Sequence, residues 1–300
     1  MSYDELAKSV QQIRESGKIA ARFESYESEW EQDFKYDELV DPKFEPYMRI
    51  PDPRSFDWMI DELGTVAEGL SSGDGMGDPL HGGSVLANPD LNKMNSAAGV
   101  LASWTGQAAT NFKVNFLDPF PSISANQFLM VVTMKGALEA YRAVCGKALE
   151  DATRIADATV AQLDNARECT SSDWSEFLQV AGAVAAVGGA ATATGPGAGF
   201  AMIGAMTAIG GAAQSFAQPG ESSPVSISGD ETAAIIESMR HAVDTLTAEI
   251  GETQKRIADA VVKSTTLVQQ KNDHFVSPRP QLAGMPGEQI TTDAGLGTST

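Results

Sequence analysis

Two long stretches of this chain carry apolar residues at a spacing of three and four positions, and this pattern constrains the fold most. The first stretch lies in a region without proline between residues 125 and 175, and it contains Met134, Leu138, Tyr141, Cys145, Ala148, Ala152, Ala156, Val160 and Leu163. The second contains Ile236, Met239, Val243, Leu246, Ile250, Ile257, Val261 and Leu267. This spacing predicts two amphipathic helices, the first roughly 40 residues and about 60 Å long. Antiparallel pairing of these two helices buries the apolar face of each, so we expect an all-α, elongated helical bundle.

A tryptophan and a glycine lie between two shorter helical patterns. The earlier pattern begins at Asn88 or Asp90 and ends near Ser103, and the tripeptide Trp104-Thr105-Gly106 follows it. Glycine permits a tight turn, and an indole just before the bend covers the open end of a helical hairpin. The residues therefore predict a helix-turn-helix hairpin, and a purely structural turn explains them as well as a recognition turn does.

The run WTGQAATNFKVNF, followed by a long alanine-rich helix, resembles the WxG-motif superfamily, whose members are exported by type VII (ESX) secretion systems. The resemblance covers about residues 89–165, and the chain length is closer to the larger PE/PPE-like ESX-associated substrates. It implies helical hairpins that pair with a second hairpin protein, recognition by a secretion ATPase and no enzymatic chemistry. Its recognition turn and assembly surface would comprise Trp104, Gly106, Phe112 and Phe116.

The export signal usual in that family, Tyr-x-x-x-Asp/Glu, does not occur. The residues four positions after each tyrosine are Ala7, Trp30, Val40, Pro51 and Cys145. The N-terminus also lacks the apolar core of a classical signal peptide. We therefore expect synthesis in the cytoplasm, secretion without a classical signal peptide or retention at the cell surface, and an export signal that is degenerate or supplied by a partner.

The segment 177–220 contains no charged residue and is rich in alanine and glycine. It predicts an apolar helical hairpin divided at Gly195-Pro196-Gly197, with three readings: conditional membrane insertion, a buried hairpin or a self-association surface. With membrane insertion, the chain resembles helical pore-forming toxins of the cytolysin-A kind, in layout alone. With a self-association surface, the chain would be a structural oligomer. The candidate membrane or oligomer contacts are Phe177, Leu178, Phe200, Met202, Ile203, Met206, Ile209 and Phe216.

Proline and glycine clusters predict the domain organisation. We expect an acidic N-terminal helical region over 1–70, a flexible loop over 71–88, a bundle domain over 89–275 and a disordered tail over 276–300. Within the first region, residues 2–33 predict one helix and 53–70 a short one. Prolines at 42, 46, 51 and 53 predict an irregular connector whose aromatic residues, Phe44, Tyr47, Phe56 and Trp58, pack onto the body.

The charge and the titratable residues exclude several classes of function. A formal net charge of −19 repels phosphate backbones, so we expect no nucleic-acid partner. His81, His241 and His274 have no ligand or catalytic partner at a known spacing, which predicts no metal, no cofactor and no enzyme. Cys145 and Cys169 lie too far apart on one helix for a disulfide and are expected to be free thiols.

Overall fold

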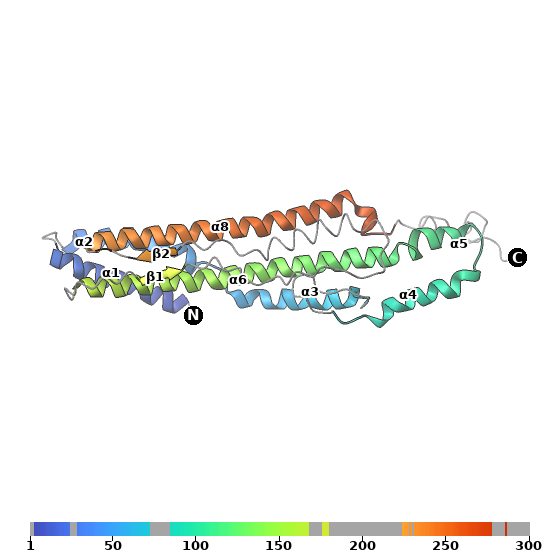
Figure 1. Ribbon diagram of the computed structural model, residues 1–300, viewed down its shortest axis with the longest axis horizontal. Coiled ribbons are helices and arrows are strands. Elements are labelled where there is room, and N and C mark those ends of the chain that lie inside the picture. Colours follow the sequence, from blue (N-terminus) through green and yellow to red (C-terminus); the bar gives the residue numbers. More distant parts are fainter. Residues whose placement is uncertain are drawn as a thin grey trace. The chain divides into compact units, whose positions relative to one another are not determined.

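The chain is mainly helical in a computed structural model that describes residues 3–24, 29–72, 85–167, 176–179, 224–227, 229, 231–277 and 286 (Figure 1). This helical content confirms the all-α class. The described residues divide between two compact units. The first draws on Met1–Asp57, Glu139–Ala186 and Gln218–Ile257, and the second on Trp58–Leu138, Val187–Ala217 and Ala258–Thr300.

The first helix of the first unit, α1 (Tyr3–Glu24), docks through an apolar stripe and two serines. Leu6, Val10 and Ile13 are buried, as their spacing predicts. The serines lie one heptad apart, as do their acceptors: Ser9 Oγ donates to Asp157 Oδ1 at 2.5 Å, and Ser16 Oγ donates to Asp164 Oδ1 at 3.0 Å. Because both pairs have the same sequence offset, α1 runs parallel to the C-terminal part of α6 (Phe120–Arg167).

The second helix, α2 (Glu29–Met48), contains Pro42 and Pro46, so the predicted irregular connector is wrong over 42–48. A proline inside a helix removes a backbone hydrogen bond and costs about 3 kcal/mol. Here, burial offsets this cost, because Val40, Phe44 and Tyr47 lie at helical spacing and all three are buried. The predicted packing of the connector aromatics is thus confirmed for Phe44 and Tyr47. It is wrong for Trp58, whose side chain is 65% exposed.

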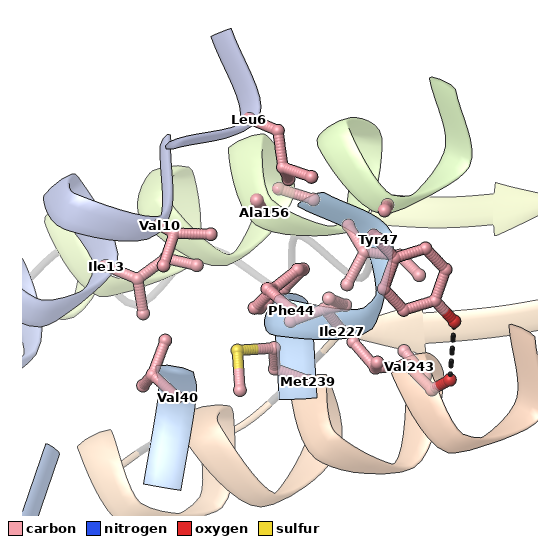
Figure 2. Close-up of a cluster of buried hydrophobic side chains, with 14 of the residues drawn as sticks. Leu6, Val10, Ile13, Val40, Phe44, Tyr47, Ala156, Ile227, Met239 and Val243 are labelled. Carbon is pink, nitrogen blue, oxygen red and sulfur yellow. Dashed lines mark hydrogen bonds between the residues drawn. The ribbon is translucent and has the colours of Figure 1, made fainter. Parts of the chain in front are cut away.

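Both predicted long helices are present: α6 has 48 residues, and α8 (Thr232–Gln270) has 39. Lys43 pairs with Asp244 at 2.5 Å, and Tyr47 Oη lies 2.7 Å from Thr247 Oγ1, so α2 and α8 run in the same direction. Figure 2 shows side chains from α1, α2, α6 and α8 in one cluster. The largest fully buried members include Leu6, Ile13, Phe44, Ile155, Leu163, Ile227, Ile235 and Met239. Residues from the predicted N-terminal region therefore share a core with residues from the predicted bundle domain.

A short antiparallel strand pair joins the first unit. Strand β1 (Glu176–Gln179) pairs with β2 (Pro224–Ile227), with Phe177 opposite Ser226 and Leu178 opposite Val225. The predicted apolar helical hairpin is therefore wrong at 177–179, because backbone pairing with a distant segment replaces helical hydrogen bonds there. Its remaining residues, 180–220, lie outside the described part of the chain.

The second unit contains the predicted turn between its shorter helices. It comprises α3 (Asp57–Leu70), α4 (Pro89–Val100), η2 (Leu101–Ser103), α5 (Gln107–Phe112), the π-helix η3 (Lys113–Leu117), the start of α6, the end of α8 and η4 (Asn272–His274). Asn88 caps α4 through its side chain, as predicted, and η1 (Pro53–Phe56) precedes α3. Within the described ranges, no helix combines the length and apolar character needed to cross a membrane.

Candidate recognition turn and aromatic ladder

The turn after η2 depends on the backbone of one glycine. Trp104 is extended, with φ −75° and ψ 123°, and Gly106 has φ 103° and ψ 174°. This combination belongs to a region of backbone space that is essentially restricted to glycine. A Cβ atom at Gly106 would meet nothing within 4 Å, so the backbone conformation, not crowding, requires glycine here.

Local hydrogen bonds hold the turn on both sides. Trp104 N donates to Leu101 O at 3.1 Å, and Thr110 donates to Gly106 O from its backbone nitrogen at 3.0 Å and from its hydroxyl at 3.1 Å. Lys113 Nζ donates to Trp104 O at 2.8 Å. The lysine that directly follows α5 therefore fixes the backbone carbonyl of the tryptophan, and the ring of Phe112, 5.7 Å away between centroids, contacts the indole.

Four aromatic rings follow one another from this turn into α6, and we call Trp104, Phe112, Phe116 and Phe120 the aromatic ladder. The ring centroids of Trp104 and Phe112 lie 5.7 Å apart, those of Phe112 and Phe116 5.2 Å and those of Phe116 and Phe120 5.9 Å. The rings are tilted against each other by 33–53°. All four side chains are partly exposed, so the ladder is fixed by its own contacts and still presents apolar surface.

The π-helix η3 connects α5 to the segment that starts α6. Asp118 N donates to Lys113 O at 2.9 Å, which is the five-residue hydrogen bond of a π-helix. Leu117 and Ala109 are buried on the inner side of this segment, while Val114 is 58% exposed. π-helical turns are rare and frequently occur at functional sites, and this one lies in the middle of the aromatic ladder.

The sequence stretch that contains the ladder is nearly neutral, unlike the chain as a whole. Residues 85–138 contain three lysines (Lys93, Lys113, Lys135) and two aspartates (Asp90, Asp118) in a protein of net charge −19. Val100 beside the turn is 78% exposed. A surface with low charge and exposed apolar side chains suits contact with another protein segment better than the acidic remainder does.

The structure brings together three of the predicted site residues and adds one. Trp104, Phe112 and Phe116 are in ring contact around the turn formed by Gly106, and Phe120 extends the series. Phe120 follows the same four-residue spacing as the two preceding phenylalanines, although it is flanked by Pro119 and Pro121, and prolines usually interrupt a helix. Pro121 in fact lies in the first turn of α6, where the missing N–H is not needed.

Of the predicted membrane or oligomer contacts, Phe177 and Leu178 lie in β1. The other six lie outside the described residues: Phe200, Met202, Ile203, Met206, Ile209 and Phe216.

The titratable groups of the described residues include one buried thiol and one buried carboxylate. Burial raises the pKa of Cys145, although a hydrogen bond with Tyr141 opposes this, so the thiol stays protonated and is a poor nucleophile. Burial also raises the pKa of Asp151, against the lowering effect of Lys147. Among the ranges given above, no three His, Cys, Asp or Glu side chains come together as metal ligands would.

Comparison with known proteins gives no assignment. No family model matches the chain, no curated protein matches it and no solved structure matches it.

Proposed function

We propose that this chain is a non-enzymatic substrate, or an associated component, of a type VII (ESX-like) secretion system. It acts through helix-bundle assembly, and its recognition surface is the turn at Trp104 and Gly106 with the aromatic ladder. The expected partner is a secretion ATPase or a second helical hairpin protein. The observation that carries the proposal is a WxG tripeptide whose indole begins a row of partly exposed rings.

The energetics of protein recognition support this surface. Aromatic side chains, tryptophan above all, contribute most to binding when a partner covers them. Contacts between neighbouring rings already restrict the ladder side chains before any partner arrives, and the hydrogen bond from Lys113 holds the backbone carbonyl of Trp104. Binding then costs less side-chain entropy than it would for mobile rings. The nearly neutral stretch 85–138 also avoids the repulsion that the acidic surface imposes on an acidic partner.

Export is tested by fractionating culture medium from cells that produce this chain with and without a functional type VII ATPase. The proposal predicts that the extracellular protein falls to the level of a cytosolic marker when the ATPase is inactive. Equal extracellular amounts in both strains, with the marker retained inside the cells, would remove the export proposal.

A further inference from the structure

The helical hairpin 89–122, which runs from α4 through the turn to the start of α6, buries few of its apolar side chains. Among its described side chains, Ala109 and Leu117 are the buried ones. The apolar residues at helical spacing along α4 and η2 are only partly buried: Leu91, Met94 and Leu101. The rings of the ladder are partly exposed as well. Two helices cannot enclose their apolar faces by themselves, so the hairpin needs a further element to cover it.

The end of α8 meets α6 after this hairpin. Asn126 Nδ2 donates to His274 O at 2.9 Å, and Gln127 Nε2 donates to Phe275 O at 2.7 Å. These bonds hold the residues that follow α8 beside the turn of α6 that comes next after the hairpin in sequence. Within the second unit, α4 and α5 extend past the end of α8 (Figure 1). In the described part of the chain, α8 therefore does not cover α4 and α5.

The aromatic ladder has a regular step that a second copy of the ladder can match. Its consecutive ring centroids lie 5.2–5.9 Å apart, close to the pitch of about 5.4 Å of an α-helix. An identical row that lies antiparallel across a two-fold axis has the same steps, so each ring of one copy fits between two rings of the other. Such a contact uses the same patch on both copies, and offset or tilted rings are the arrangement that aromatic side chains prefer.

The charges of the hairpin allow two copies to meet there. The chain has a net charge of −19, so two copies repel each other over most of their surface. The hairpin contains Lys93 and Lys113 against Asp90 and Asp118, and its net charge is zero. A neutral apolar surface offers little for a strongly charged partner to recognise, whereas it removes the repulsion that opposes a second copy.

We propose that the hairpin 89–122 pairs with the same hairpin of a second copy, and that the two form a four-helix bundle with the ladders at its centre. Four packed helices enclose the apolar faces that one hairpin leaves open. The proposal rests on the assembly role proposed above for this surface and names its partner. A monomer that is exported by the ATPase would remove the dimer and leave the proposed function. A dimer that is released without the ATPase would do the reverse.

Sedimentation equilibrium of the full-length protein tests for the dimer. The mass is expected to rise with concentration from 31.6 kDa towards twice this value. Phe116→Asp places a charge in the ladder of each copy and is expected to weaken association about tenfold or more. Val262→Asp adds the same charge in α8, at a side chain that is 62% exposed, and is expected to leave association unchanged. A constant monomer mass for the wild type, or equal association of the two variants, would overturn the proposal.

Photo-crosslinking tests the same contact without adding a charge to the hairpin. p-Benzoylphenylalanine replaces Phe116, and in the matched control it replaces Trp58, an aromatic side chain of the same unit that is 65% exposed. We expect position 116 to link to residues 104–120 of another copy and to give at least fivefold more covalent dimer than position 58. Links from position 116 that stay within one chain, or equal amounts of covalent dimer from the two positions, would exclude this interface.

Discussion

The indole of Trp104 lies 5.7 Å, centroid to centroid, from the ring of Phe112, across a turn whose Gly106 has a φ of 103°. The two rings belong to segments on opposite sides of that glycine. Their contact therefore depends on a backbone conformation that other residues rarely adopt. A change at Gly106 is expected to alter both the stability of the second unit and the ladder.

Gly106→Ala is expected to reduce the free energy of unfolding by about 1–3 kcal/mol. The added methyl group meets no atom within 4 Å, so the whole cost comes from the backbone conformation. Urea unfolding followed by circular dichroism measures the loss.

Gly99→Ala is the matched control, because Gly99 lies in α4 and its added methyl group also meets nothing within 4 Å. There, the same substitution is expected to stabilise the protein by about 0.5–1 kcal/mol. Equal effects of the two substitutions would show that Gly106 is not under conformational constraint.

Phe44→Ala is expected to cost about 3–5 kcal/mol of unfolding free energy. Phe44 is fully buried in the core of the first unit, and truncation leaves a cavity among side chains of four helices (Figure 2). Trp58→Ala, at a side chain that is 65% exposed, is expected to change stability by less than about 0.5 kcal/mol. Chemical denaturation measures the free energy of unfolding of both variants. Similar losses of this free energy would contradict the assignment of Phe44 to the core.

The long helices and the turn were predictable from the sequence because local signals specify them. The apolar stripes of α6 and α8 repeat over many turns, and Gly106 follows an indole at the end of a helical pattern. These features require no knowledge of distant residues. The all-α class follows from them directly.

Elements that depend on distant partners were not predictable. Helix α2 runs through Pro42 and Pro46 because Val40, Phe44 and Tyr47 are buried against other helices, and this tertiary gain is invisible in the local sequence. Strand β1 has four residues, and its partner β2 follows more than forty positions later. In the ladder, Phe120 was not among the predicted residues, because flanking prolines locally favour a helix break, although α6 tolerates Pro121 in its first turn.

Tyr47 gives the first unit a specific sensitivity to alkaline pH. Burial raises the pKa of Tyr47 to about 12, and the hydrogen bond with Thr247 opposes this increase. A raised folded-state pKa means that the contribution to stability is complete below the unfolded value near 10 and is lost as the pH rises towards 12. The loss is on the order of 2 kcal/mol.

The comparison with Tyr47→Phe isolates this effect. At pH 8, the variant is expected to be less stable than the wild type by about 0.5–1.5 kcal/mol, because it lacks the hydroxyl hydrogen bond. Between pH 10 and 12, the wild type loses this advantage. Urea unfolding across this range tests the prediction, and a constant difference between the two proteins would refute it.

Asp151 is expected to destabilise the first unit at neutral pH. Its side chain is 2% exposed, and its Oδ2 atom has no hydrogen-bond partner among the described residues, while Oδ1 pairs with Lys147 at 3.0 Å. Because burial raises its pKa above the unfolded value of 3.8, its favourable contribution is present below that value and is lost as the pH rises through the folded pKa.

Asp151→Asn is therefore expected to be more stable than the wild type at pH 7, because the amide has no charge to desolvate. Lys147 and Arg154 are partly exposed and can be hydrated after the charge is removed. Thermal unfolding at pH 7 and pH 3 should show this advantage shrinking in acid, and Asp61→Asn at an exposed position is the control. A variant that is less stable at both pH values would contradict the prediction.

The most direct test of the proposed function is the extracellular amount of Trp104→Ala relative to Trp58→Ala in cells with a functional type VII system. Both variants remove an indole, but only Trp104 belongs to the turn and its ladder. Loss of a central aromatic contact is expected to weaken recognition by about tenfold or more, so the medium should contain far less of the Trp104 variant at equal cellular levels. Equal secretion of both variants and the wild type would contradict the assignment of recognition to this turn.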